Sequence, residues 1–161
     1  MTDRDGDGWR IVEDDLSGTA IRALLEVHFA GMLANSPAES CHFLDFDGLR
    51  GDGVTFWSIH KNDELAGCGA LKLLGGVHGE IKSMRTAERF LRQGVAARML
   101  VHIMNEASAR GLDRLSLETG SSPAFEPALA LYRAHGFEEC EPFGDYKPDS
   151  FSRFMTRSLQ S

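Results

Sequence analysis

The sequence predicts an α/β fold with one mixed, mostly antiparallel central sheet that is flanked by helices. Two observations lead to this prediction. Two segments rich in β-forming residues, 54–60 and 65–74, flank a polar turn and therefore form an antiparallel hairpin. After residue 79, strands and helices alternate along the chain, which implies right-handed crossovers and parallel pairing. A sheet that contains both kinds of connection is mixed.

Apolar periodicity predicts the elements of the first third of the chain. Trp9–Glu13 is expected to be a strand. Residues 17–34 are expected to form a helix capped by Ser17 or Asp15, because its apolar side chains recur at helical spacing. The apolar side chains are Ile21, Leu24, Leu25, Phe29, Met32 and Leu33, and His28 falls at the same spacing. Residues 36–50 follow as a short irregular or helical crossover.

Turn and capping residues complete the prediction for the second half of the chain. The expected elements are a strand at 79–85, a helix over 94–110, a strand at Arg114–Thr119, a helix from Pro127 to Gly136, and a closing hairpin of residues 137–142 and 151–158. The inward face of the helix over 94–110 is expected to be Ala96, Leu100, Ile103 and Ala107.

Length and composition are those of one globular domain. The 161 residues are 42% apolar and 25% charged, which suffices for a core without disulfides or a structural metal. The acidic start of the chain predicts a disordered tail over residues 1–8, followed by a single domain over residues 9–161. The three cysteines form no C-x-x-C pair and the histidines have no ligand spacing, so no metal site is expected.

The charge balance excludes some partners. Seventeen basic and 24 acidic residues give a formal net charge of −7, which argues against binding to nucleic acid. No apolar run approaches the roughly 20 residues needed to span a bilayer, and the polar N-terminus is unlike a signal peptide. We therefore expect a cytoplasmic protein without a nucleic-acid or membrane partner.

Residues 91–96, Leu-Arg-Gln-Gly-Val-Ala, lie between a predicted strand and a predicted helix. The start of a helix presents backbone N–H groups that lack a partner within the helix, and its dipole favours anions. Gly94 lets the backbone approach a ligand closely because no Cβ intervenes. The turn suits a pyrophosphate, although the pattern is neither G-x-G-x-x-G nor G-x-x-x-x-G-K-[ST]. The alternative is an ordinary turn before a helix.

A second pattern, Ala-x-x-Leu-Tyr-x-x-x-Gly-Phe, occupies residues 128–137. By itself it describes an apolar helix that ends at a glycine. Together with the turn at Gly94 it resembles the GNAT superfamily of N-acetyltransferases, over nearly the whole chain and most specifically from Gly79 to Phe137. The final segment is similar to an uncharacterised bacterial subgroup of that superfamily.

The resemblance implies a GNAT-like sheet whose fourth and fifth strands, 79–85 and 114–119, splay apart around acetyl-CoA as the co-substrate, with no metal. The residues that would bind this co-substrate are Met84, Arg85, Thr86, Arg92, Gln93, Gly94, Val95, Ala96 and Ala97. Two positions depart from the family pattern. Leu91 stands where Arg or Gln is common, and Phe125 stands where Asn is common.

The resemblance also implies catalytic roles. An amine is mostly protonated at neutral pH, so a base must remove its proton. Glu80 stands at the position of a catalytic Glu in the family; Glu118 and water are the alternatives, and an ion pair with Lys82 is the competing role for Glu80. Tyr132 matches the family's general acid for the leaving thiolate, with core packing as its alternative role. Candidate contacts to the acceptor substrate are Glu118, Tyr146 and Arg153.

The activity implied is an N-acetyltransferase that moves an acetyl group from acetyl-CoA directly to a primary amine of a small molecule or a peptide N-terminus. Two alternatives stay open. One is a catalytically silent module that binds or senses acyl-CoA on the same fold, because fold does not dictate function. The other is a protein-lysine acetyltransferase. The sequence is compatible with a homodimer and does not identify the acceptor.

Overall fold

The computed structural model describes residues 3–4, 8–38 and 44–159. One mixed sheet runs through the molecule, with the strand order β1-β2-β3-β4-β5-β6-β8-β7. Its strands are β1 (Asp3–Arg4), β2 (Trp9–Glu13), β3 (Val54–Lys61), β4 (Glu64–Gly75), β5 (His78–Thr86), β6 (Arg114–Thr119), β7 (Glu138–Glu139) and β8 (Arg153–Ser158). All neighbours pair antiparallel except β5 and β6, which are parallel. The predicted mixed, mostly antiparallel sheet is confirmed.

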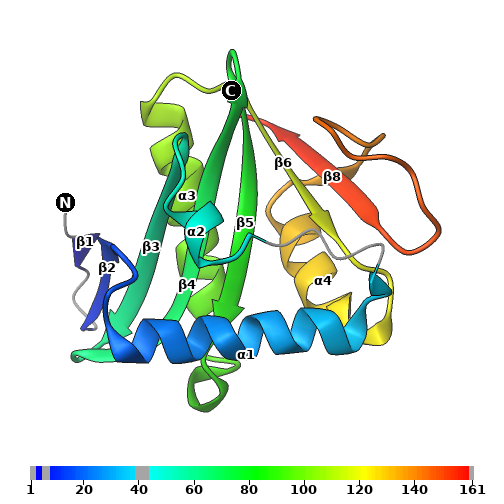
Figure 1. The fold of residues 1–161 in the computed structure, drawn as a ribbon. Helices are drawn as coiled ribbons and strands as arrows, with labels where there is room; N and C mark the ends of the chain where they lie inside the picture. The colour runs from blue at the N-terminus through cyan, green and yellow to red at the C-terminus, as the bar shows by residue number, and fades with distance from the viewer. Residues whose placement is uncertain (1–2, 5–7, 39–43, 160–161) are drawn as a thin grey trace.

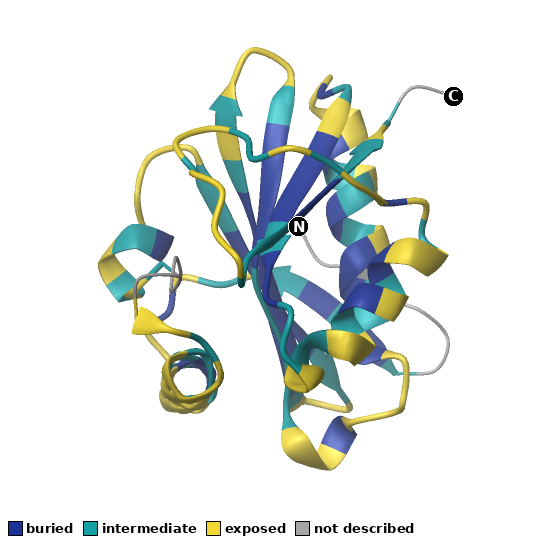
Figure 2. Cartoon of the chain, turned by 90° about the vertical axis from the view of Figure 1, so that its right-hand side faces the viewer, coloured by how far each residue is buried: buried dark blue, intermediate teal, exposed yellow. Residues whose placement is uncertain are grey.

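Helices cover both faces of this sheet. They are α1 (Thr19–Asn35), α2 (Phe46–Leu49), α3 (Val95–Ala109) and α4 (Glu126–Ala134), with short 3-10 turns at Glu88–Phe90 and Pro123–Phe125. Figure 2 shows α1 end-on at one side of the sheet and the helices α3 and α4 at the other side. The buried residues concentrate on the sheet between these layers.

Each layer has its own core. The larger core lies between the sheet and the helices α3 and α4; its fully buried members include Met99, Leu100, Leu115, Leu117 and Leu129. The smaller core packs α1 and α2 onto β3 and β4. It contains Leu16, Ile21, Leu25, Leu49, Phe56, Cys68 and Ala70. The larger core continues from β5 across to β6, α4 and β8, whereas the smaller core stays with β3 and β4.

The strands β5 and β6 pair over only three residues each. His78, Gly79 and Glu80 face Arg114, Leu115 and Ser116, and the pairing stops there. β6 continues to pair with β8 as far as Thr119. The two strands consequently diverge from the shared end toward α1, as Figure 1 shows. The predicted splay of these strands, residues 79–85 and 114–119 in the sequence, is confirmed.

A β-bulge explains how β5 turns away. Cys68 and Ala70 of β4 face Arg85 and Lys82 of β5, so β5 has one more residue than its partner in this interval. Ser83 lies in the bulge with φ of 58°, in the left-handed region that a non-glycine residue seldom adopts. A bulge bends its strand and shifts the alternation of side chains by one residue.

The shifted alternation sends Arg85 toward α1. Its Nε donates to Nδ1 of His28 at 3.2 Å, and Nη2 donates to the His28 carbonyl oxygen at 3.3 Å. A Cβ on Gly31, one turn further along α1, would lie 2.5 Å from Nη2. A glycine is therefore required at this point for α1 and Arg85 to pack so closely.

Several expectations about individual residues are corrected. Asp3 and Arg4, inside the predicted disordered tail, form β1, because the edge strand β2 offers unpaired backbone groups; residues 1–2 and 5–7 lie outside the described residues. Gly18 is the N-cap of α1, because the carboxylate of Asp15 instead accepts hydrogen bonds from the backbone and hydroxyl of Ser17. Leu33, predicted to face inward, is 58% exposed because α1 extends beyond the sheet core.

A change of pH should reveal the contact between α1 and β5. Burial, and to a smaller extent the nearby Arg85, lower the pKa of His28 to about 4. Between pH 6.5 and 4 the unfolded chain therefore binds a proton that the native state does not, and stability falls as the pH falls. This histidine alone should remove roughly 3 kcal/mol from the free energy of unfolding.

The measurement is urea denaturation at pH 7.5, 5.5 and 4.5. His28→Gln should reduce the acid loss by most of that amount. His135→Gln, at the far end of α4, should retain the loss that the unaltered protein has. An acid dependence that is the same in both variants would contradict the assignment to His28.

Candidate active site

A long cleft of about 570 Å³ lies between the end of β5, the start of α3 and α4. Eight of the nine residues predicted to bind acetyl-CoA line it: Met84, Arg85, Thr86, Arg92, Gly94, Val95, Ala96 and Ala97. Gln93 is exposed, and its side-chain amide donates to the carbonyl oxygen of Arg89 at 3.2 Å. Ala96 was predicted to face the core of the sheet; it is half-buried and lies at the cleft instead.

The start of α3 forms one end of this cleft. Gly94 is the N-cap, with φ of 82° and no capping side chain. The first bond within the helix runs from the Arg98 N–H to the Gly94 carbonyl oxygen at 3.0 Å. The N–H groups before Arg98 therefore have no helical partner and point out of the helix end. No described atom lies within 4 Å of the position that a Cβ on Gly94 would take. This end of the cleft suits an anion such as a pyrophosphate.

The two departures from the family pattern have different surroundings. Leu91 lies on the wall of the long cleft and is 53% exposed. The absence of Arg or Gln at this position therefore removes no buried polar side chain. Phe125 stacks edge-on against Phe151, with ring centroids 5.7 Å apart, and it lines a second cavity rather than the long cleft. In this chain the residue at the position where Asn is common, Phe125, therefore lies at the second cavity.

The second cavity, about 120 Å³, fills the fork between β5 and β6 beneath α1. Its walls are His28 and Met32 of α1, Ile81, Lys82, Ser83 and Met84 of β5, Leu117, Glu118 and Thr119 of β6, and Phe125, Ala128 and Tyr132 beside them. Three of these residues, Met84, Ala128 and Tyr132, also line the long cleft. The two cavities therefore adjoin at these side chains.

Tyr132 occupies that junction. It is 6% exposed, and its ring packs edge-on against Phe137 with centroids 5.8 Å apart. Burial raises the pKa of its hydroxyl to about 12. Among the described residues this hydroxyl has no hydrogen-bond partner, although most buried tyrosine hydroxyls have one. The hydroxyl thus remains able to donate to a group bound where the cavities meet.

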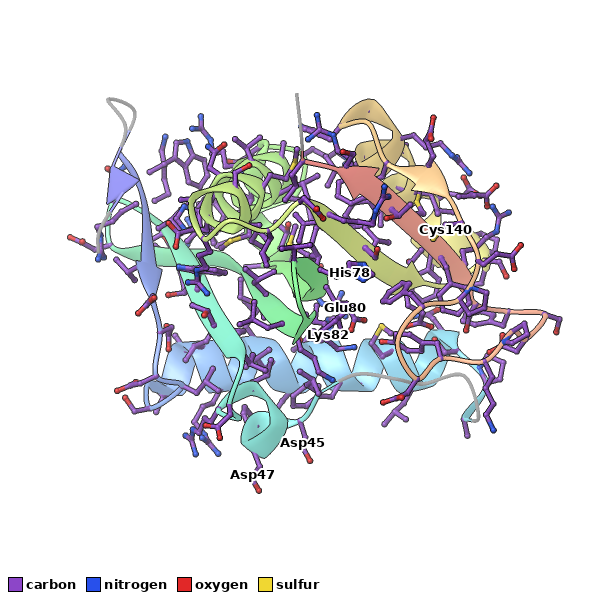
Figure 3. The ribbon with its side chains drawn as sticks, turned by 90° about the horizontal axis from the view of Figure 1, so that it is seen from above. Asp45, Asp47, His78, Glu80, Lys82 and Cys140 are labelled. Atoms are coloured by element: carbon purple, nitrogen blue, oxygen red, sulfur yellow. The ribbon has the colours of Figure 1, made fainter. Side chains whose placement is uncertain are left out.

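Glu80 lies at the end of the fork where β5 and β6 pair, and the side chain of Tyr146 covers it. It is 2% exposed, and its Oε2 accepts from Lys82 Nζ at 3.2 Å and from the Tyr146 hydroxyl at 2.5 Å. Lys82 also donates to the Tyr146 hydroxyl at 2.8 Å. Figure 3 shows Glu80 and Lys82 side by side along β5, with His78 beyond them. The pair expected between Glu80 and Lys82 is therefore present, and it is buried.

Aromatic packing holds Tyr146 in place over Glu80. It belongs to the loop before β8 and packs with Phe143 and Phe154, at centroid distances of 5.2 and 5.5 Å. Burial, and then the negative charge of Glu80, raise the pKa of Tyr146. A neutral hydroxyl therefore bridges the ion pair, and Tyr146 contacts Lys82, which lines the second cavity.

The remaining predicted contacts separate. Glu118 lies on the wall of the second cavity. Arg153 faces Thr119 in the sheet register and pairs with Glu139 at 2.5 Å, on the face that packs against α4. The structure therefore brings Glu118 together with Tyr132 and does not bring Arg153 to the same cavity.

Sequence reasoning assigned no binding or catalytic role to several residues of the second cavity, including Lys82, His28 and Ser83. Lys82 entered only as a partner of Glu80, His28 was interpreted as structural, and Ser83 was not considered. The alternation of β5 placed Lys82 on one face with Glu80, but only the fold shows that α1 and the fork enclose that face. Ser83 could not be assigned to a face because the sequence carries no signal for the bulge.

Two general properties of the described residues complete the description. None of the helices in the described ranges has the length and apolar character required to cross a membrane. Within the same ranges, no three His, Cys, Asp or Glu side chains gather as a metal site would require.

Comparison with known proteins identifies the family of the chain. The model of the acetyltransferase (GNAT) family covers residues 20–137. The chain is 55% identical over 146 residues to YsnE, an uncharacterized N-acetyltransferase of Bacillus subtilis, which covers 91% of this chain and 97% of that protein. It is 52% identical to YedL, an uncharacterized N-acetyltransferase of Escherichia coli, over 92% of this chain and 94% of that protein.

A more distant relative and a solved structure extend the comparison. An IAA acetyltransferase from Azospirillum brasilense is 39% identical over 76% of this chain and 80% of its own. A GNAT family acetyltransferase from Elizabethkingia anophelis with acetyl-CoA bound has the same fold, with a TM-score of 0.70 at 20% identity over 95% of this chain and 99% of its own. The match of the family model and the identity to these relatives show that the chain belongs to the acetyltransferase (GNAT) family.

Proposed function

We propose that this protein is an acetyl-CoA-dependent N-acetyltransferase that transfers the acetyl group directly to a primary amine of a small molecule. The observation that carries the proposal is the junction of the two cavities at Tyr132. A cleft with an anion-binding end suits CoA, and the smaller adjoining cavity suits an amine. A volume of about 120 Å³ favours a small acceptor over a folded protein.

In direct transfer the amine nitrogen forms a bond to the acetyl carbon while the bond from that carbon to sulfur breaks. The amine loses a proton and the departing thiolate gains one. No covalent intermediate on the enzyme is required. The chain therefore has to bind both substrates, accept a proton beside the second cavity and stabilise the thiolate at the junction.

Tyr132 is proposed to stabilise the thiolate by hydrogen bonding. With a pKa of about 12, its hydroxyl is a weaker acid than a thiol. Full proton transfer to the thiolate would be uphill by roughly 5 kcal/mol. A hydrogen bond that strengthens as charge develops on sulfur avoids this cost and acts in the transition state.

Glu118 is proposed as the group that accepts the amine proton. Its position on the wall of the second cavity supports this role. Glu80, the residue favoured from the sequence, does not line this cavity, and its Oε2 already accepts from Lys82 and Tyr146. Glu80 stays the alternative base, acting through the network that connects it to Lys82.

The direct experiment is release of free thiol from acetyl-CoA in the presence of a panel of amines, together with calorimetry of CoA binding. The proposal expects tight CoA binding and thiol release with at least one amine. CoA binding without thiol release for any amine would favour a silent sensor module instead.

The anion-binding end of the cleft can be tested at Gly94. Gly94→Asp places a negative charge where the pyrophosphate is proposed to bind, and Asp tolerates both the left-handed conformation and the start of a helix. CoA affinity should fall at least tenfold, or about 1.4 kcal/mol, by calorimetry. Gly94→Asn has nearly the same shape without the charge and should weaken CoA less. Unchanged affinity in the Asp variant would refute the assignment of this end of the cleft.

The role of Tyr132 can be tested by removing its hydroxyl alone. Tyr132→Phe should lower kcat about 100-fold and leave the KM for acetyl-CoA nearly constant, because the lost hydrogen bond forms mainly in the transition state. The control is Tyr146→Phe, the other tyrosine of the chain, which should act on the KM of the acceptor. A Tyr132→Phe enzyme with full kcat and a lower melting temperature would assign this residue to packing only.

The two carboxylates can be separated by their pH–rate profiles. Glu118→Gln should lower kcat and flatten the acidic limb of the profile, because the titrating base is lost. Glu80→Gln should leave the shape of the profile unchanged but destabilise the fold by about 3 kcal/mol, since it leaves the buried Lys82 without its counter-charge. The reverse assignment of the two profiles would identify Glu80 as the base.

A further inference from the structure

From the charges around the second cavity we infer that the acceptor amine also carries a carboxylate group, as amino acids do, and that the guanidinium of Arg85 binds this carboxylate. The inference rests on the proposed function, because it names the class of acceptor for the same site. It concerns the side chain of Arg85, whereas the resemblance to GNAT enzymes implied only its backbone.

The first step is the charge along the face of β5 that lies under α1. Glu80, Lys82 and Arg85 share this face because the bulge at Ser83 restores Arg85 to it. Glu80 and Lys82 form a buried ion pair and cancel each other. Arg85 has no carboxylate within ion-pair distance among the described residues. The face therefore carries one uncompensated positive charge.

The second step is the location of this charge. Arg85 contacts His28 through two hydrogen bonds, and His28 lines the second cavity. Arg85 itself lines the long cleft where β5 ends. Its guanidinium thus lies against α1, in contact with a residue that forms the wall of the second cavity. Burial lowers the pKa of Arg85, so the group has been partly removed from water without an anion beside it. A half-buried cation in this situation is a site for an anionic ligand group.

The third step is the hydrogen-bond character of the neighbouring groups. His28 accepts from Arg85 at Nδ1 and is neutral above pH 4, so its hydrogen is on Nε2, which makes that atom a donor. The Ser83 hydroxyl lines the same cavity, and it is buried without a partner in the described part of the chain. His28 and Ser83 thus bring donors to one wall of the cavity, and Arg85 contacts His28 next to this wall, which suits the oxygens of a carboxylate.

The opposite wall carries the opposite charge. Glu118 lies on β6, across the fork from β5. A cavity with a carboxylate on one wall and a guanidinium in contact with another wall residue, His28, complements a molecule that bears both an ammonium and a carboxylate. The cavity of about 120 Å³ limits the size of that molecule to the range of single amino acids.

The test compares L-amino acids with their carboxamides, in which an uncharged NH2 group replaces one oxygen of the carboxylate. Binding to the enzyme saturated with CoA is measured by calorimetry, and thiol release from acetyl-CoA is measured in parallel. At least one amino acid should bind ten times more tightly than its carboxamide, and Arg85→Gln should reduce this ratio to about one. Arg85→Lys, which retains the charge but not the paired donors, should keep part of the ratio. Arg10→Gln removes an arginine of β2 that pairs with Asp63, in the turn between β3 and β4, and this variant should keep the whole ratio.

The outcomes separate the inference from the proposed function. If no amino acid binds better than its carboxamide, or if the ratio survives in Arg85→Gln, the inference is refuted. If Arg85→Gln and Arg85→Lys weaken acid and carboxamide alike, Arg85 only supports α1, and the inference is again refuted. If the binding ratio depends on Arg85 but no amine releases thiol, the inference holds for ligand recognition and the proposed transferase activity fails.

Discussion

The short pairing between β5 and β6 is the constraint on which the rest of the site depends. Three residues of β5 face three residues of β6, after which the strands diverge. Full pairing would place β5 and β6 about 5 Å apart along their length and close the fork. The bulge at Ser83 bends β5 away instead, and β8 keeps β6 in the sheet. Both cavities exist because β5 does not pair with β6 beyond these three residues.

The same bulge distributes the side chains of β5 between the two faces of the sheet. Lys82 lies on the face toward α1, and one extra residue returns Arg85 to that face. Met84 lies on the opposite face, where its sulfur and Met99 of α3 both approach Gly69. Without the extra residue, Met84 would face α1 and Arg85 would be buried against α3. One backbone irregularity thus opens the fork and also brings a cation into contact with His28.

Burial explains why neighbouring polar groups have different tasks. Glu80 and Lys82 are both buried, and the Tyr146 hydroxyl hydrogen-bonds to both of them, so the charges within this network cancel. Tyr132 is equally buried but has no partner among the described residues. Burial raises the pKa of its hydroxyl to about 12. A closed network stabilises the fork, and an unsatisfied donor beside it stays available to a substrate.

The sequence by itself determined the mixed sheet, the three long helices to within two residues and the glycine turn at the start of α3, because periodicity, capping and turn chemistry act over a few neighbouring residues. Through the resemblance to the GNAT superfamily, it also linked Tyr132 and the turn at Gly94 to one function. Only the tertiary structure decided that Glu80 is covered by Tyr146, that Glu118 and Tyr132 share a cavity while Arg153 does not, and that Arg85 turns toward His28. The contacts of Glu80 with Tyr146 and of Arg85 with His28 join residues more than 50 positions apart, and the direction of Arg85 also depends on a bulge that has no local sequence signal. No pattern within a single segment can specify them.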